Sequence, residues 1–116
     1  MARLFLRVDL QPQGRIGPGK IALLEEIDRS GSISAAGRAL GMSYRRAWLL
    51  VDDLNKLLGE PVVATQLGRS HGGGASLTPL GSDLVARFRA LEQAAAPLVR
   101  EHLGPFEAMA ARSAGE

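Results

Sequence analysis

The chain contains no cysteine, few aromatic residues (4%) and no long apolar run. Without cysteine there is no disulfide framework, no thiolate nucleophile and no zinc site built on sulfur. The apolar runs are only a few residues long, which is too short to span a bilayer. Arg3, Arg7 and Asp9 interrupt the N-terminal segment, whereas a signal peptide has a continuous apolar centre. We therefore expect a cytoplasmic protein without a membrane segment.

Catalytic and metal-binding motifs are also missing. The two histidines, His71 and His102, are isolated, and neither has a histidine or glutamate four residues further on. The triple glycine at 72–74 is not followed by the Lys-Ser/Thr pair of a phosphate-binding loop, and there is no nucleophile elbow. Adjacent acids such as Asp52 and Asp53 are most simply solvated charges on a helix face. We expect no catalytic residue, no metal site and no cofactor.

The composition is that of one ordinary globular domain. The 116 residues are 46% hydrophobic and 22% charged, and a chain of this length buries enough surface to fold without cross-links. The net charge is only +2, but between Arg29 and Val51 the chain has four arginines and no acidic residue. Such a cationic segment is typical of a surface that binds phosphate, although a solvated face would show the same pattern.

The N-terminal third predicts a strand followed by a helix. Apolar and polar residues alternate over 3–10, which favours a strand, and the segment 11–19 is rich in glycine and proline, which favours a loop. A helical period begins at Lys20 and ends at Ser30 and Gly31.

Two helices joined by about three residues form the central motif. Ser32 and Ser34 offer N-caps to a short, alanine-rich helix that ends at Gly41. Ser43 offers the cap of the next helix, which is expected over about 44–58. A short helix of small residues that packs closely on a longer helix is typical of a helix-turn-helix.

A hairpin is expected after this motif. Residues 62–65 and 75–77 have the pattern of two strands, and the glycine-rich segment 67–74 forms the tip between them. Thr78 and Pro79 then have the positions of the N-cap and first residue of a helix. We call the hairpin over 62–77 the wing.

The last helix carries an apolar stripe that exceeds what one small domain needs at its edge. Pro97 predicts a kink or break near Ala96, and the tail beyond Phe106 is expected to fray. The elements together predict a mainly α fold with a small β-hairpin wing: a winged helix-turn-helix with an N-terminal strand and a long C-terminal helix. We place the winged helix-turn-helix domain at 1–78 and the C-terminal helix region at 79–112, within one structural unit.

The third helix has the properties of a helix that reads the major groove of DNA. Arg45 and Arg46 lie in its first turn, and arginine can bond guanine O6 and N7 together. Leu49 lies among polar residues and suits contact with a thymine methyl, although an isolated surface leucine is also ordinary. Serines at helix starts suit phosphate oxygens as well as capping, and basic residues of the wing suit the DNA backbone. The candidate DNA-contact residues are Ser32, Ser34, Ser43, Tyr44, Arg45, Arg46, Leu49, Lys56, Arg69 and His71.

Three segments resemble a known family: GSISAAGRALGMSYRRAWLLV (31–51), GEPVV (59–63) and GGGASLTPLG (72–81). They are similar to the N-terminal DNA-binding domain of ModE-type molybdate-responsive transcriptional regulators and, more loosely, to the LysR-type winged helix-turn-helix. The resemblance covers roughly 18–90 and implies a DNA-binding regulator whose recognition helix is 43–58. It also implies a homodimer formed through the first strand and the long last helix. The candidate interface residues are Leu4, Leu6, Leu84, Phe88 and Leu91.

The chain departs from that family at its C-terminus. Full-length members continue into oxyanion-binding domains, whereas this sequence ends at Glu116, just after the last helix. We therefore expect no molybdate site within the chain, and the Met1 start favours a stand-alone regulator over a fragment.

The predicted function is a sequence-specific DNA-binding transcriptional regulator that acts as a homodimer on a palindromic site. Two alternatives stay open. One is a dimerisation partner of a full-length regulator that does not itself bind DNA, and the other is an architectural protein that binds all duplexes equally.

Overall fold

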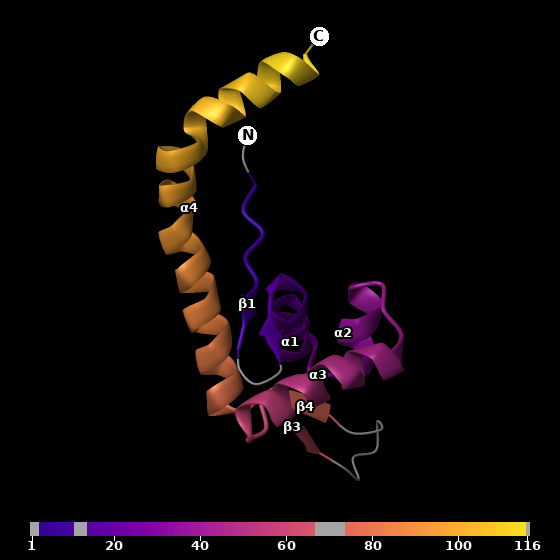
Figure 1. Cartoon of the computed structure of the whole chain (residues 1–116). Coiled ribbons are helices and arrows are strands. Elements are labelled where there is room, and N and C mark those ends of the chain that lie inside the picture. Colours follow the sequence, from indigo (N-terminus) through magenta and orange to yellow (C-terminus); the bar gives the residue numbers. More distant parts are fainter. Residues whose placement is uncertain (1–2, 11–13, 67–73, 116) are drawn as a thin grey trace.

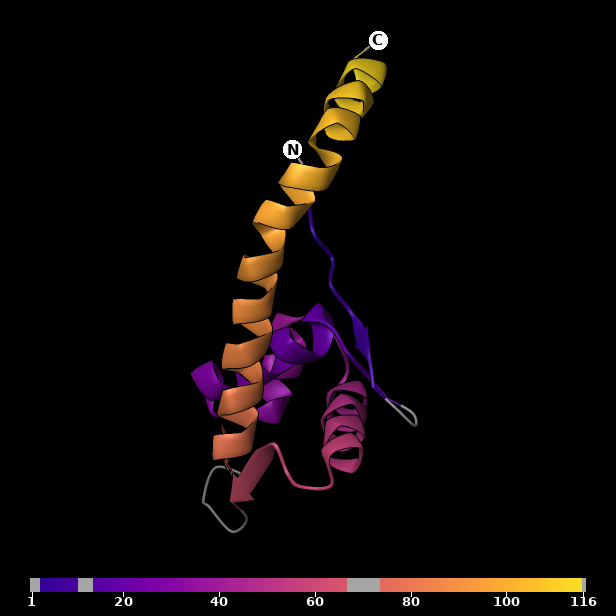
Figure 2. The same cartoon turned by 60° about the vertical axis from the view of Figure 1, so that its left-hand side comes forward.

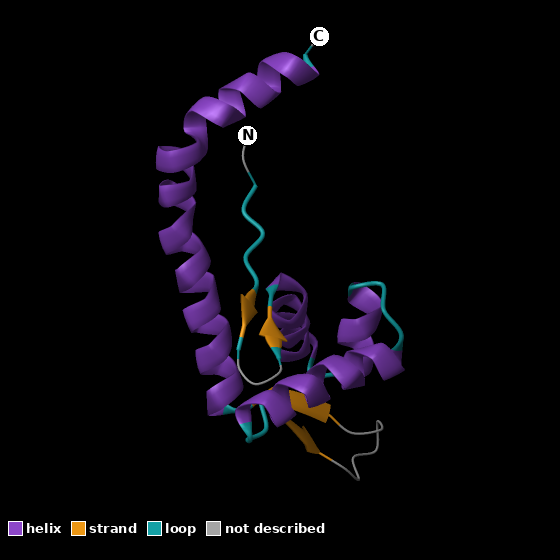
Figure 3. Ribbon diagram, viewed as in Figure 1, coloured by secondary structure: helices purple, strands orange, loops and turns teal. Residues whose placement is uncertain are grey.

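Three helices form the centre of the fold, and a fourth, much longer helix extends away from them (Figure 1). The computed structural model describes residues 3–10, 14–66 and 74–115. The molecule measures 58 × 31 × 21 Å, and its long dimension reflects the fourth helix. Figure 3 shows two small strand pairs beside the helices. The predicted class, a mainly helical winged helix-turn-helix with a long C-terminal helix, is confirmed.

The first helix, α1, runs from Pro18 to Ser30 and contributes four buried side chains to the core, those of Ile21, Leu23, Leu24 and Ile27. It begins two residues before the expected Lys20, because proline suits the first helical position, where no backbone N–H is needed. Gly31 ends it in the left-handed conformation (φ 72°), and its N–H donates to the Ile27 carbonyl at 2.8 Å.

The helix-turn-helix consists of α2 (Ile33–Ala39) and α3 (Tyr44–Leu58). Gly37 of α2 is buried where the two helices meet: a methyl group there would lie 3.4 Å from the Ala47 side chain and 3.3 Å from the Met42 carbonyl. The close approach that small residues predicted for this motif is confirmed.

The N-terminal strand is much shorter than expected. Only Val8–Asp9 (β1) forms a strand, and it pairs antiparallel with Arg15–Ile16 (β2), which the sequence had placed in a loop. Pairing explains both differences. Residues 3–7 pair with no other described strand and form none, whereas Arg15 and Ile16 form a strand because they pair with Asp9 and Val8. Exposure nevertheless alternates along 3–9, with Leu4 and Leu6 half-buried.

The wing is the antiparallel pair of β3 (Val63–Gln66) and β4 (Gly74–Leu77), with Val63 opposite Leu77. The Ala75 N–H donates to the Gly31 carbonyl at 2.9 Å, which ties the wing to the end of α1. The strands agree with the predicted ones to within one residue.

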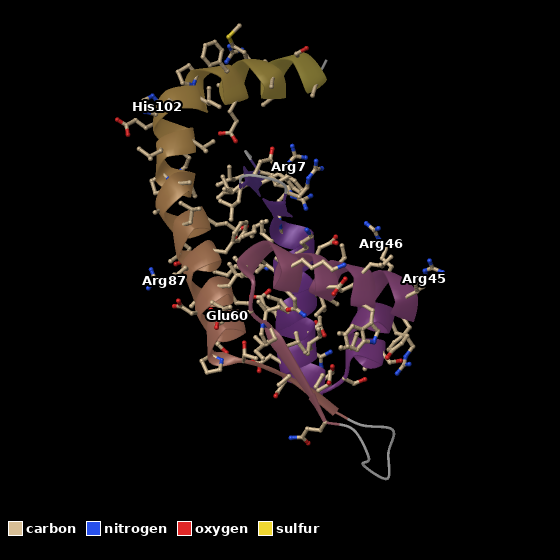
Figure 4. All side chains as sticks on the ribbon, turned by 60° about the horizontal axis from the view of Figure 1, so that its bottom comes forward. Arg7, Arg45, Arg46, Glu60, Arg87 and His102 are labelled. Carbon is tan, nitrogen blue, oxygen red and sulfur yellow. The ribbon has the colours of Figure 1, made fainter. Side chains whose placement is uncertain are left out.

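The last helix, α4, runs from Pro79 to Ala114 without interruption. The break expected near Ala96 is wrong, and so is the frayed tail beyond Phe106, since the helix continues through both of its internal prolines. A bend is visible beside His102 (Figure 4). Pro105 explains a bend there, because a proline ring clashes with the carbonyl four residues earlier and lacks an N–H for it.

The core lies between α1, α2, α3 and the start of the wing. Its largest fully buried side chains belong to Ile21, Leu23, Leu24, Ile27, Val51, Leu54 and Val62. Phe88 is the one large α4 side chain among the buried hydrophobic residues of the described chain. Figure 2 shows the rest of α4 projecting beyond this core, alongside the extended N-terminal segment. Within the described ranges, no helix is long and apolar enough to cross a membrane.

Candidate nucleic-acid interface

The first turn of α3 presents two arginines to solvent. Ala47, Val51 and Leu54 face the core and are at most 1% exposed, so the opposite side of the helix is left for a partner. Arg45 and Arg46 are both exposed, and Figure 4 shows them pointing away from the body of the molecule at the free end of α3. Neither guanidinium has an ion-pair partner among the described residues. Both are therefore available to an anionic ligand.

An outward row of side chains continues from Arg45 along α3. Leu49 lies four residues on and is 49% exposed, and Lys56 lies a further two turns along. An exposed leucine between two cations combines apolar contact with charge, which suits the edges of base pairs.

The second half of α3 is electrostatically different from the first. Lys56 Nζ lies 2.9 Å from an Asp52 carboxylate oxygen, and this hydrogen bond raises the pKa of Lys56. Asp52 and Asp53 offset the positive charge at that point of the helix. The unpaired cationic charge of α3 is thus concentrated in its first turn, where the helix dipole is also positive.

The candidate serines all act within the helix-turn-helix. Ser32 and Ser43 are the N-caps of α2 and α3, accepting hydrogen bonds from the N–H groups of Ala35 and Arg46 at 3.0 and 3.1 Å. Ser34 accepts from the Arg38 guanidinium at 3.0 Å. The caps fix the start of each helix, and contact of these serines with phosphate stays a prediction.

Tyr44 and Trp48 form an edge-to-face pair on one flank of α3, with ring centroids 6.4 Å apart. Tyr44 is 56% exposed, whereas Trp48 is half-buried and packs against the core. Tyr44 is accordingly the member of the pair that a ligand can reach. Arg69 and His71, the candidates from the wing, lie outside the described residues and stay predictions.

Two cations beside Arg46 escaped the sequence analysis. Arg15 of β2 and Lys20 of α1 line a surface cleft together with Arg46 and the same flank of α3. The unpredicted pairing of β1 with β2 is what brings Arg15 there. The sequence offered only one indication of this role, the positive charge of Arg15 within the segment 11–19 that was predicted as a loop. In the described part of the chain, no group of acidic or histidine side chains could hold a metal ion.

The candidate interface residues differ in their accessibility. Leu4, Leu6 and Leu84 are half-buried and Leu91 is 45% exposed, whereas Phe88 is only 4% exposed because it fills the core of its own chain. Phe88 therefore has little surface left for a second subunit. Large exposed side chains do continue along α4 beyond Leu91; they are Leu98, Leu103, Phe106 and Met109.

Curated relatives share the sequence of this domain. The chain is 48% identical over 85 residues to the molybdenum-pterin-binding protein MopB of Rhodobacter capsulatus, covering 73% of the chain and 32% of that protein. It is 40% identical over 92 residues to the molybdenum transport protein ModE of Azotobacter vinelandii (79% and 33%). It is 36% identical over 92 residues to the DNA-binding transcriptional dual regulator ModE of Escherichia coli K12 (79% and 35%). The chain thus matches about a third of the length of each relative.

Solved structures share the fold at low sequence identity. The DNA-binding domain of CbnR in complex with DNA has a TM-score of 0.51 and 19% identity, covering 84% of this chain and 97% of that one. Full-length CbnR with its target DNA has a TM-score of 0.54 and 23% identity, covering 73% and 28%.

The family is established by the central part of the sequence. Residues 19–82, more than half of the chain, match the bacterial regulatory helix-turn-helix proteins of the lysR family. This range extends from the first turn of α1 to the first turn of α4 and includes α2, α3 and the wing. The chain therefore belongs to the LysR family of bacterial regulatory helix-turn-helix proteins, with the proteins named ModE and MopB among its relatives.

Proposed function

We propose that the protein is a transcriptional regulator that binds duplex DNA sequence-specifically as a homodimer. The observation that carries this is the exposed, unpaired Arg45 and Arg46 at the start of α3. The first turn of a helix-turn-helix recognition helix is the part that meets base edges. The names of the relatives and the DNA complexes among the structural neighbours support the same conclusion. With DNA as its partner, the protein acts in the cytoplasm.

The dimer forms through α4 and the N-terminal segment. These two elements adjoin each other, since Arg3 lines a shared hollow with the α4 residues Leu103 and Phe106. The large apolar side chains exposed on α4 are the surface that a second copy covers. A two-fold dimer reads a palindrome whose half-sites lie about 34 Å, or a multiple of this, apart.

The test begins by selecting bound sequences from a random duplex pool and titrating the best one beside a scrambled duplex. Arg45→Ala and Arg46→Ala should each weaken binding to the selected site more than to the scrambled one, by about 1–3 kcal/mol. Arg87→Ala is the control, because Arg87 is an equally charged, exposed residue of α4 far from α3.

The alternatives correspond to separate outcomes. Equal affinity of the parent for all duplexes indicates architectural binding. No retention of any duplex at low salt indicates a dimerisation partner that does not bind DNA. If Arg45→Ala and Arg46→Ala bind both duplexes as the parent does, the assignment of α3 as the recognition helix is wrong.

A further inference from the structure

A cationic cleft of about 790 Å³ opens beside the recognition helix. Gly14 and Arg15, at the start of β2, form one wall with Lys20 of α1, and a flank of α3 forms the other. Gly14 lets the hairpin approach α3 closely, because a methyl group there would overlap with the Leu57 side chain. The cleft is lined by Gly14, Arg15, Lys20, Arg46, Leu50, Asp53, Lys56 and Leu57.

The charge of the cleft favours an anion. Its lining includes four cations and one carboxylate, that of Asp53. Within the described chain, the guanidinium groups of Arg15 and Arg46 have neither an ion pair nor a hydrogen bond. The Asp53 carboxylate lies 4.0 Å from Lys20 Nζ, at the outer limit of an ion pair. Lys56 is paired with Asp52, so the positive charge that the protein leaves uncompensated in the cleft is that of Arg15 and Arg46.

Lys20 is held in place inside this cleft. Its side chain is only 13% exposed, and its Nζ donates a 2.9 Å hydrogen bond to the Arg15 carbonyl. An ammonium group has three N–H donors, and that bond is the one it makes to the described residues. A largely buried lysine that is positioned by one bond retains donors for a ligand.

The cleft faces a different direction from the outward row of α3. Arg46, Leu50 and Leu57 line up along one flank of the helix, whereas Arg45 and Leu49 face outward. Lys56 belongs to the outward row by its position, and its side chain also lines the cleft. When a helix lies in the major groove, its outer surface meets base edges and its flanks face the sugar-phosphate backbones that border the groove.

We propose that this cleft binds a phosphate group, with Arg15 and Lys20 as ligands, and that the phosphate is one of the DNA backbone beside the groove that α3 reads. The source of the phosphate rests on the proposed function, whereas the anion site itself does not. Hairpin and helix would then hold one strand of the duplex between them, and the hairpin would set the depth and register of α3 without contacting any base.

Arg15→Gln is the principal test, because Arg15 is exposed and its guanidinium has no partner among the described residues. A backbone contact contributes equally to all sequences and to the salt dependence. We expect a loss of affinity of about five- to tenfold near 0.1 M salt for the selected and the scrambled duplex alike. The slope of log affinity against log salt should fall by about 0.9.

Lys20→Gln should act in the same way, and thermal melting shows whether it still folds. Arg87→Gln is the matched control, since it removes the same charge from an exposed position on α4 and should leave affinity and slope unchanged. Arg15→Gln with parental affinity and slope overturns the backbone contact, as does a loss confined to the selected duplex, which indicates base reading instead.

A second arm uses inorganic phosphate without DNA, monitored through the backbone amide signals of Gly14 and Arg15. Saturable shifts that Arg15→Gln abolishes, together with unchanged DNA binding, assign the cleft to free phosphate. If neither DNA binding nor phosphate binding depends on Arg15, the proposed site is overturned altogether. If the parent binds no duplex, the proposed function fails, and the phosphate arm alone decides the cleft.

Discussion

Arg89 of α4 makes a two-pronged contact with the carboxylate of Glu25 on α1, through Nη2 at 2.7 Å and Nε at 3.1 Å. The remaining terminal nitrogen donates to Glu92 one turn along α4 at 2.7 Å. These bonds raise the pKa of Arg89, so the guanidinium stays charged wherever the protein is folded. The contact orients the long helix against α1.

Arg89→Ala should therefore lower the free energy of unfolding by about 1 kcal/mol, a modest value because both side chains are partly exposed. The exposed pair Arg87–Asp83 has the same chemistry within one helix, so Arg87→Ala should cost at most about 0.5 kcal/mol. Urea unfolding of both variants checks the difference. Equal losses would mean that the contact between α1 and α4 has no special weight.

Gly81→Ala should be strongly destabilising, because a methyl group at Gly81 would overlap with the Val62 carbonyl, which is backbone and cannot move aside. We expect a loss of about 1–3 kcal/mol. Gly19 of α1 has nothing but its chain neighbours within 4 Å of an added methyl, so Gly19→Ala should stabilise, by up to about 1 kcal/mol. Thermal melting of each variant tests this: the first substitution should lower the midpoint temperature and the second should raise it.

Ser43→Asp separates the capping role of Ser43 from its proposed place beside DNA. Aspartate caps helices as well as serine does, so stability should be retained. A carboxylate beside DNA phosphate should nevertheless weaken duplex binding at low salt. Ser82→Asp adds the same charge to an exposed site in the first turn of α4 and should not. Unaltered binding by Ser43→Asp would place the start of α3 away from phosphate.

Leu98→Glu combined with Leu103→Glu tests the proposed dimer surface. Both side chains are about half exposed in the single chain (54% and 52%), so these changes should alter the stability of one subunit by no more than about 0.5 kcal/mol. Sedimentation equilibrium should show that the variant is monomeric at concentrations where the parent is a dimer. Phe88→Ala should instead lower the free energy of unfolding of the subunit by about 3–5 kcal/mol, because Phe88 is in the core.

The elements that could be predicted from the sequence are those with local signals. Ser32, Ser43 and Thr78 cap the three helices that they were expected to cap, since an N-cap depends only on the residues of the next turn. Gly31 and Gly59 end α1 and α3 for the same reason.

The features that were missed depend on distant contacts or on tolerance of strain. The pairing of Val8 with Ile16 is decided by packing against the core, where Ile16 is only 6% exposed, and not by the glycines around it. Pro97 lies within α4 because one lost hydrogen bond does not outweigh the bonds on either side of it. The cleft beside Arg46 could not be foreseen, since one of its walls is the unpredicted hairpin.

The segment between α3 and α4 joins the two helices through bonds to the main chain. The Asn55 side chain accepts from the Val62 N–H at 2.8 Å, and the Thr78 hydroxyl donates to the Pro61 carbonyl at 2.8 Å. Because these bonds connect α4 to the end of α3, a change in the direction of α4 would also move α3. In the proposed dimer, a rotation of a few degrees between the two α4 helices would change the distance between the two α3 helices by several ångströms. The operator spacing that the dimer accepts would then be set by the packing of α4, far from any base.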